Sequence, residues 1–222
     1  LVHMKKELGK TQSQSYMLYT EYKRPVKEFF WTLMLNHFNI RQDHLMHTEY
    51  QDNQFKLTSL EHPHRTENYQ ARSLISKGFY SWNLKASLEA VYQYGKGLQA
   101  GQGIVQPYEN HWLSFKPKLN WNPTHWLTAS YQAEIGCSRT IALPTLWEVQ
   151  QKLSLSIGND TWNLNLNGEH YRNELSPNEY KETWLADIGL QYNTGKWRWT
   201  ASLTNLFNQK EYRQTTYSDI RS

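Results

Sequence analysis

Hydrophobic and polar residues alternate along most of this chain. From Tyr80 to Tyr94 every even-numbered residue is an aromatic, Leu or Ala residue, and every odd-numbered residue except Val91 is polar. Successive side chains of a β-strand point to opposite faces, so this run predicts a strand with one apolar face. A helix would leave the aromatic residues at the two ends of the run without a common face.

The same alternation recurs throughout the sequence. It is clear after residue 80 and weaker before it, most of all near 45–50, 54–60 and 67–76. The pattern predicts an all-β protein of about ten to twelve strands, without a helix. The expected strands are 16–22, 29–35, 45–50, 54–60, 67–76, 80–94, 113–121, 127–135, 152–157, 162–167, 184–193 and 197–204.

The connections between these strands are expected to alternate in length. Short turns rich in Gly, Asn, Asp or Pro, as hairpins require, are predicted at 76–78, 121–124, 158–161 and 193–196. Longer loops are predicted at 95–110, 136–146 and 172–182. This alternation is typical of an up-and-down meander, and transmembrane β-barrels have short periplasmic turns and long extracellular loops.

Aromatic residues gather at the ends of the apolar runs. Rings at both ends of an aliphatic band match the aromatic girdles of a membrane barrel, so these residues are predicted to lie at the membrane interfaces. They are Tyr80, Trp82, Tyr92, Tyr94, Trp121, Trp162, Trp184, Tyr192, Trp197 and Trp199. The opposite face is predicted to line a watery lumen, with Lys116, Lys118, Gln132, Glu134, Asn163, Asn165 and Asn167 as lumen-facing residues.

The amino-acid composition is consistent with a β-sheet that has one polar, hydrated face. A hydrophobic content of 38% and a mean hydropathy of −0.81 are low for a protein with a core, while 14% aromatic residues argue against disorder. The strands of a membrane barrel are half polar and give such values. No apolar stretch is long enough for a membrane-spanning helix. The net charge of +4 comes from scattered basic residues, so no nucleic-acid partner is expected.

Catalytic and metal-binding motifs are missing from the sequence. The pairs His44/His47 and His62/His64 supply too few ligands for a zinc site, and Cys137, in a predicted loop, is the single cysteine. We therefore expect neither an enzyme nor a bound cofactor or metal. The Trp residues leave open a second interpretation, as stacking platforms for sugars in a soluble protein.

The C-terminal region reads Trp199-Thr-Ala-Ser-Leu203-Thr-Asn205-Leu206-Phe207-Asn208, with Tyr212 a few residues on. This resembles the penultimate strand and following loop of TonB-dependent outer-membrane receptors, in which Asn-Leu-Phe-Asn followed by an aromatic residue recurs. Segments 48–59, 75–78 and 217–222 are similar to receptors of this class from Bacteroidetes-type bacteria.

The resemblance implies a location in the outer membrane of a Gram-negative bacterium. It also implies the fold of an antiparallel up-and-down transmembrane β-barrel, of which residues 1–222 would be one part. The plug domain and the last strand are expected to lie outside this sequence. The partners implied are outer-membrane lipid, the plug domain, the TonB energy-transducing protein and an unknown small nutrient ligand.

Two alternatives stay open at this point. One is a passive, porin-like small barrel in the same membrane. The other is a soluble, Trp-rich carbohydrate-binding β protein. The sequence does not specify the transported ligand in either membrane interpretation.

Overall fold

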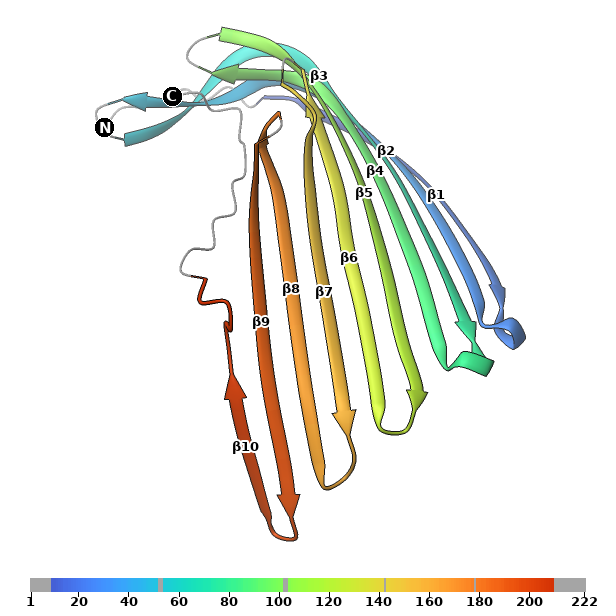
Figure 1. Ribbon diagram of the computed structural model, residues 1–222. Helices are drawn as coiled ribbons and strands as arrows, with labels where there is room; N and C mark the ends of the chain where they lie inside the picture. Colours follow the sequence, from blue (N-terminus) through green and yellow to red (C-terminus); the bar gives the residue numbers. More distant parts are fainter. Residues whose placement is uncertain (1–8, 52–53, 102–103, 142, 178, 210–222) are drawn as a thin grey trace.

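A single antiparallel sheet makes up the whole described structure. The computed structural model describes residues 9–51, 54–101, 104–141, 143–177 and 179–209. They form ten strands whose order in the sheet is their order in the chain (Figure 1). The sheet is not closed into a barrel. The all-β, up-and-down prediction is confirmed at the level of this open sheet.

Most of the described residues lie in strands, and the two short 3-10 turns are η1 (Pro25–Lys27) and η2 (Tyr80–Trp82). The described residues contain no helix long and apolar enough to cross a membrane. The strands are β1 (Thr11–Arg24), β2 (Phe29–Gln51), β3 (Gln54–Phe79), β4 (Leu84–Gly101), β5 (Ile104–Thr124), β6 (Leu127–Thr140), β7 (Leu146–Gly158), β8 (Trp162–Ser176), β9 (Glu179–Thr194) and β10 (Trp197–Leu203).

The strands are longer than the sequence predicted, and the predicted long loops are wrong. β2 and β3 each absorb segments that were expected to be separate, and β4 continues to Gly101 where a loop over 95–110 was expected. Lys96 faces Glu109, and Gln99 faces Gln106, as ladder partners. These segments pair as strands although their sequences do not alternate clearly between apolar and polar residues. Likewise 136–146 and 172–182 shrink to 141–145 and 177–178.

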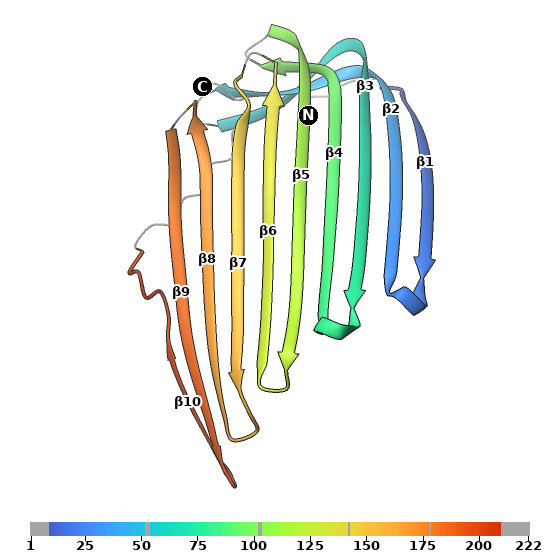
Figure 2. The ribbon, with the colours of Figure 1, turned by 45° about the vertical axis from the view of Figure 1, so that its right-hand side comes forward.

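Two extended hairpins therefore project from one end of the sheet. Figure 2 shows the outer parts of β2–β3 and β4–β5 bending to the same side, at the end opposite the five short turns. The short turns at 158–161 and 193–196 occur close to where they were predicted, and the predicted turn at 121–124 falls a few residues later.

The predicted turn at 76–78 is wrong, because those residues belong to β3. The chain turns instead at η2, which ends on Asn83 with a left-handed φ of 47°. Gly78 is required by close packing and not by a turn. A Cβ atom on it would lie 1.6 Å from Oε2 of Glu28, in the preceding hairpin turn. Tyr80 and Trp82 consequently lie in the turn, ahead of β4.

Backbone hydrogen bonds tie the five hairpins together at the short-turn end. η1 and η2 have the same geometry, each followed by a residue in the left-handed region, Glu28 or Asn83. The carbonyl oxygen of that residue accepts a bond from the next hairpin, and the later turns continue the series. The four bonds are Gly78 N to Glu28 O (3.0 Å), Asn122 N to Asn83 O (3.0 Å), Gly158 N to Trp126 O (2.9 Å) and Asn193 N to Thr161 O (2.7 Å).

Gly158 closes one of these contacts and leaves no room for a side chain. A Cβ there would lie 2.2 Å from the carbonyl oxygen of Trp162, which is backbone and cannot rotate away. We expect Gly158→Ala to destabilise the folded protein by about 1–3 kcal/mol, as overpacking does. The measurement is urea unfolding of the full-length protein, followed by tryptophan fluorescence.

Gly168 on β8 provides the matched control, since nothing lies within 4 Å of its ideal Cβ position. Gly168→Ala should leave the unfolding midpoint nearly unchanged. Equal losses for the two variants would mean that the contact at Gly158 does not limit stability.

Candidate functional site

The ladder register divides the sheet into two chemically different faces. In one row, Leu35 faces Leu18 on one side and Ala71 on the other, and the same row continues through Tyr92 to Leu113. The next row along the strands exposes residues of the other face, such as Arg72 beside Met34 and Val91. The apolar runs found in the sequence therefore share one face across all ten strands. We call it the apolar face and its opposite the polar face.

The apolar face carries a band without charged residues. On β4 no Asp, Glu, Lys or Arg side chain lies on this face from Leu84 to Tyr94, a stretch of 11 residues. β5 and β6 have bands of the same length, and those of β8 and β9 span 9 residues, from Trp162 to His170 and from Trp184 to Tyr192. A tilted strand needs about 9–11 residues to cross a bilayer.

No part of the described chain covers this band. Leu88, Leu119, Leu153 and Leu190 have 42%, 40%, 46% and 46% of their surface exposed. The described chain has three buried hydrophobic residues, Leu45, Val91 and Ala133. A sandwich would bury these leucines against a second sheet about 10 Å away. The band instead presents an apolar surface to the surroundings.

A row of aromatic rings crosses five strands at the end of the band away from the short turns. His37 stacks on Tyr69 with ring centroids 4.3 Å apart, and Tyr94 lies 4.7 Å from His111. Tyr92 Oη lies 2.9 Å from His111 Nδ1. We call this the far-end aromatic row, and its members are Tyr16, His37, Tyr69, Tyr94 and His111, which are partners in successive ladders.

Charged side chains begin directly beyond that row. The carboxylate of Glu67 lies 2.8 Å from Arg65 Nε and 3.1 Å from Lys96 Nζ. The ammonium group of Lys96, which hydrogen-bonds Glu67, lowers the pKa of that carboxyl. Tyr69 also donates its hydroxyl to Glu67, at 3.3 Å. The tyrosine rings thus lie toward the aliphatic band while their hydroxyls meet charges, which is how aromatic residues sit at a membrane surface.

The aromatic residues singled out in the sequence lie at both ends of the band. Figure 1 shows the short-turn end at the bottom, where β4 and β10 meet their turns. At that end lie Tyr80, Trp82, Trp121, Trp162, Tyr192, Trp197 and Trp199, and at the far end lie Tyr92, Tyr94 and Trp184. All but Tyr94 are at least 40% exposed. Their contact with lipid stays a prediction.

Sequence reasoning missed part of the far-end row. Tyr16, His37, Tyr69 and His111 were not singled out as interface residues, although Tyr16 begins the predicted strand 16–22. Only the strand register shows that these four residues, together with Tyr94, form one row across five strands. The signal that could have found them is an aromatic or His residue at the outer end of each alternating run.

A short polar chain interrupts the apolar face near Trp184. Tyr131 donates its hydroxyl to Gln151 Oε1 at 3.0 Å, and Gln151 Nε2 lies 3.4 Å from His170 Nδ1. The His170 ring stacks on Trp184 with centroids 4.0 Å apart. Tyr131, Gln151 and His170 Nδ1 thus contact one another, which lowers the cost of placing polar groups on an apolar face. His170 Nε2 is buried without a partner.

The polar face carries charges of alternating sign on six successive strands. Ion pairs join Arg72 to Glu89 (2.6 Å), Lys116 to Glu134 (2.7 Å) and Lys152 to Glu169 (3.0 Å). Glu89 and Lys116 are ladder partners as well, so the pairs follow one another across β3 to β8. We call these six residues the charge belt. Its charges cancel, and each pair is partly exposed and contributes little to stability.

The predicted lumen-facing residues all share this polar face. Lys116 and Glu134 belong to the charge belt, and Lys118 lies opposite Gln132 in the ladder. Asn163, Asn165 and Asn167 follow one another along β8, with Ser156 and Ser154 opposite Asn165 and Asn167 on β7. Ser156 Oγ donates to Asn163 Oδ1 at 3.1 Å. That the face borders a lumen stays a prediction, since an open sheet encloses none.

The Asn-Leu-Phe-Asn segment forms a tight turn that ends β10. Asn205 and Asn208 both have left-handed backbones, with φ of 54° and 51°. The Asn205 side chain closes the turn, because its Nδ2 donates to Gln209 O (3.0 Å) and its Oδ1 accepts from Gln209 N (2.9 Å). Asn205 N donates to the Asp187 carboxylate on β9 at 2.8 Å. Leu206 and Phe207 are exposed, and Tyr212 lies outside the described residues.

Cys137 was expected in a loop, and this is wrong. It lies within β6 on the apolar face, opposite Leu113 and Trp147. The strand continues past it because both neighbouring ladders extend to Ser138. Over the described part of the chain, no group of three His, Cys, Asp or Glu residues could hold a metal ion.

Known proteins give no independent assignment. No family of known proteins matches the chain, and no curated protein is significantly similar to it. The argument for function therefore rests on the two faces and on the resemblance at Asn205–Asn208.

The two faces make opposite predictions for an added charge. Leu166 lies mid-band on the apolar face, between Leu155 and Ile188, whereas Asn165 lies on the polar face beside Ser156. In a bilayer, Leu166→Arg should cost about 2–4 kcal/mol of folding free energy and Asn165→Arg far less. The measurement is refolding of the full-length protein into lipid vesicles. Equal losses, or a larger loss for Asn165→Arg, would contradict the assignment of the faces.

Proposed function

We propose that this chain is part of the barrel wall of a TonB-dependent outer-membrane receptor that takes up a nutrient ligand. Its apolar face contacts the hydrocarbon of the outer membrane, and its polar face borders the lumen. The plug domain and the TonB energy-transducing protein are partners of the whole receptor. Any energised transport belongs to that assembly and not to the wall alone.

One observation carries the membrane part of the proposal, namely the uncharged band of 9–11 residues on β4, β5, β6, β8 and β9, with aromatic rings gathered toward both ends of the sheet. Its length fits a tilted crossing of the bilayer, and its leucines are exposed. Antiparallel ladders also satisfy the backbone N–H and C=O groups within the sheet, as hydrocarbon requires. Among the ten described strands, only the edge strands β1 and β10 lack a described neighbour on one side.

The chemistry of the polar face favours a water-filled lumen on that side of the sheet. The charge belt and the Asn side chains of β8 would be costly against a protein core, because burial removes the water that solvates charged and polar groups. A water-filled lumen keeps them solvated. The charges of the belt cancel, so the face suits a ligand of low net charge better than a strongly charged one.

The assignment to this receptor family rests on the Asn205–Asn208 resemblance. The left-handed turn gives that motif a physical reason, since Asn tolerates such backbones and its side chain closes the turn. The soluble, carbohydrate-binding alternative has no comparable support. It would need another layer to cover the exposed leucines of the band.

Cysteine labelling tests the membrane orientation. In cells that carry the full-length protein, Cys137 should resist a membrane-impermeant maleimide, because its side chain faces lipid beside Trp147. In a Cys137→Ser background, Thr145→Cys in the β6–β7 connection should be labelled from outside intact cells. Asp160→Cys, in the turn after β7, should be labelled only once the outer membrane is opened.

The outcomes separate the alternatives. Labelling of Asp160→Cys but not Thr145→Cys on intact cells would reverse the topology. A protein that fractionates as soluble, with Cys137 labelled immediately, would overturn the receptor proposal in favour of the soluble alternative.

The unpaired edges of the sheet allow a test that distinguishes part of a receptor barrel from a small porin-like barrel. In hydrocarbon, each unpaired backbone group costs several kcal/mol, so residues 1–222 alone should aggregate in detergent unless β1 and β10 find partners. Size-exclusion chromatography and gel mobility before and after heating are the measurements. A monodisperse, heat-modifiable monomer would favour the porin-like barrel.

A further inference from the structure

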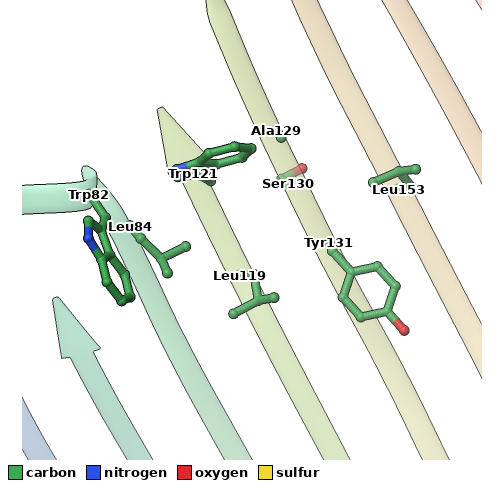
Figure 3. Close-up of a pocket in the computed structure, with 8 residues that line it drawn as sticks. All are labelled: Trp82, Leu84, Leu119, Trp121, Ala129, Ser130, Tyr131 and Leu153. Carbon is green, nitrogen blue, oxygen red and sulfur yellow. The ribbon is translucent and has the colours of Figure 1, made fainter. Parts of the chain in front are cut away.

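A hollow interrupts the apolar face near the short-turn end. It has a volume of about 420 Å³ and lies over β4 to β7. Figure 3 shows Trp82 and Trp121 toward the turns and Tyr131 and Leu153 on the other side, with the small Ala129 between the larger side chains. In the ladder Ala129 lies beside Trp121, so the missing bulk at residue 129 creates the hollow.

The surface that lines the hollow is almost wholly apolar. Its walls are indole and phenol rings and the side chains of Leu84, Leu119 and Leu153. The Tyr131 hydroxyl is already bound by Gln151, so it offers no free donor to an occupant. Side chains around a void lose contacts that only another apolar group can restore. The occupant must therefore be apolar where it enters.

A positive charge lies near the short-turn end of the hollow. Lys77 Nζ lies 5.7 Å from the Phe79 ring centroid, and Phe79 in turn stacks on Trp82, 5.8 Å away. One cation thus lies a single ring away from the lining. The occupant should carry a negative group at the short-turn end of its apolar part.

The short-turn end as a whole carries the net charge of the chain. Its hairpin ends contain three acidic residues, Glu21, Glu28 and Asp160, against seven basic ones. The excess is +4, and the rest of the chain has 17 basic and 17 acidic residues (24 − 7 and 20 − 3). The basic residues are Lys23, Arg24, Lys27, Lys77, Lys85, Lys196 and Arg198.

We propose that this hollow is a binding site for an anionic phospholipid. One acyl chain lies over Ala129 between Trp121, Tyr131 and Leu153, and the phosphate lies at the basic short-turn end, near Lys77. The inference rests on the proposed membrane location, because only there does the hollow meet acyl chains. An anionic lipid held at this end would fix the depth of β4 to β7 in the bilayer.

The test uses the full-length protein in two kinds of vesicle, phosphatidylcholine alone and phosphatidylcholine with phosphatidylglycerol. After extraction in mild detergent, mass spectrometry measures the lipid retained per protein. Phosphatidylglycerol with a photoreactive acyl chain locates the site, and the cross-linked peptide should contain Leu119 or Tyr131. Retention should favour phosphatidylglycerol over phosphatidylcholine.

Two variants separate the two halves of the site. Ala129→Phe fills the hollow and should abolish cross-linking at this peptide. Lys77→Gln should reduce the preference for phosphatidylglycerol about fivefold, as expected for one cation near a membrane surface, while leaving acyl cross-linking in place. The matched controls are Ala186→Phe, next to Gly168 on the same face, and Lys181→Gln at the other end of β9. Both should behave as wild type.

Several outcomes overturn the inference. They are equal retention of the two lipids, cross-linking spread over the whole apolar face, and wild-type behaviour of Ala129→Phe. If the protein inserts in vesicles and any of these is seen, the lipid site fails while the proposed function stands. If the protein does not insert at all, the proposed function and the lipid site fail together.

Discussion

Hydrogen bonding between neighbouring strands is the interaction on which the rest of this structure depends. The described chain has almost no core, because its buried hydrophobic residues are Leu45, Val91 and Ala133. Order comes from nine antiparallel ladders and from the backbone bonds that tie each hairpin to the next at the short-turn end. A sheet held in this way needs surroundings that do not compete for its backbone groups and that accept an apolar face. Hydrocarbon meets both conditions.

The two faces divide the remaining chemistry. On the apolar side of β4 the order is Trp82 in the preceding turn, an uncharged band, the rings of Tyr92 and Tyr94, and then Lys96, which pairs with Glu67. On the polar face the charges begin inside the same span, as the pair of Lys116 and Glu134 shows. Because side chains alternate, each strand serves both surroundings within one stretch of chain. The alternation keeps the mean hydropathy of the chain low although one face of the sheet is apolar.

The two ends of the sheet differ in shape and charge. The short-turn end is compact, bonded from hairpin to hairpin, and carries the whole positive excess of the chain. The other end extends into the long β2–β3 and β4–β5 hairpins, which bend to one side (Figure 2). A sheet with short turns and excess positive charge at one end, and long hairpins at the other, can lie in a membrane in a defined direction. The hollow beside Trp121 lies at the short-turn end, where anionic headgroups would meet that charge.

The alternating pattern by itself determined the fold class, the meander order and the face of the residues within the strands predicted after Leu84, because side-chain direction follows from a period of two. It also determined the polar composition of the opposite face, from Lys116 to Asn167. Only the tertiary structure decided the rest. The extended hairpins pair segments that do not alternate clearly between apolar and polar residues. Gly78 packs closely against the side chain of Glu28, 50 positions away, and Cys137 belongs to a strand although the sequence predicted a loop there. The far-end aromatic row, the charge belt and the hollow over Ala129 depend on register between strands. Register joins residues far apart in the chain, so no local pattern encodes it.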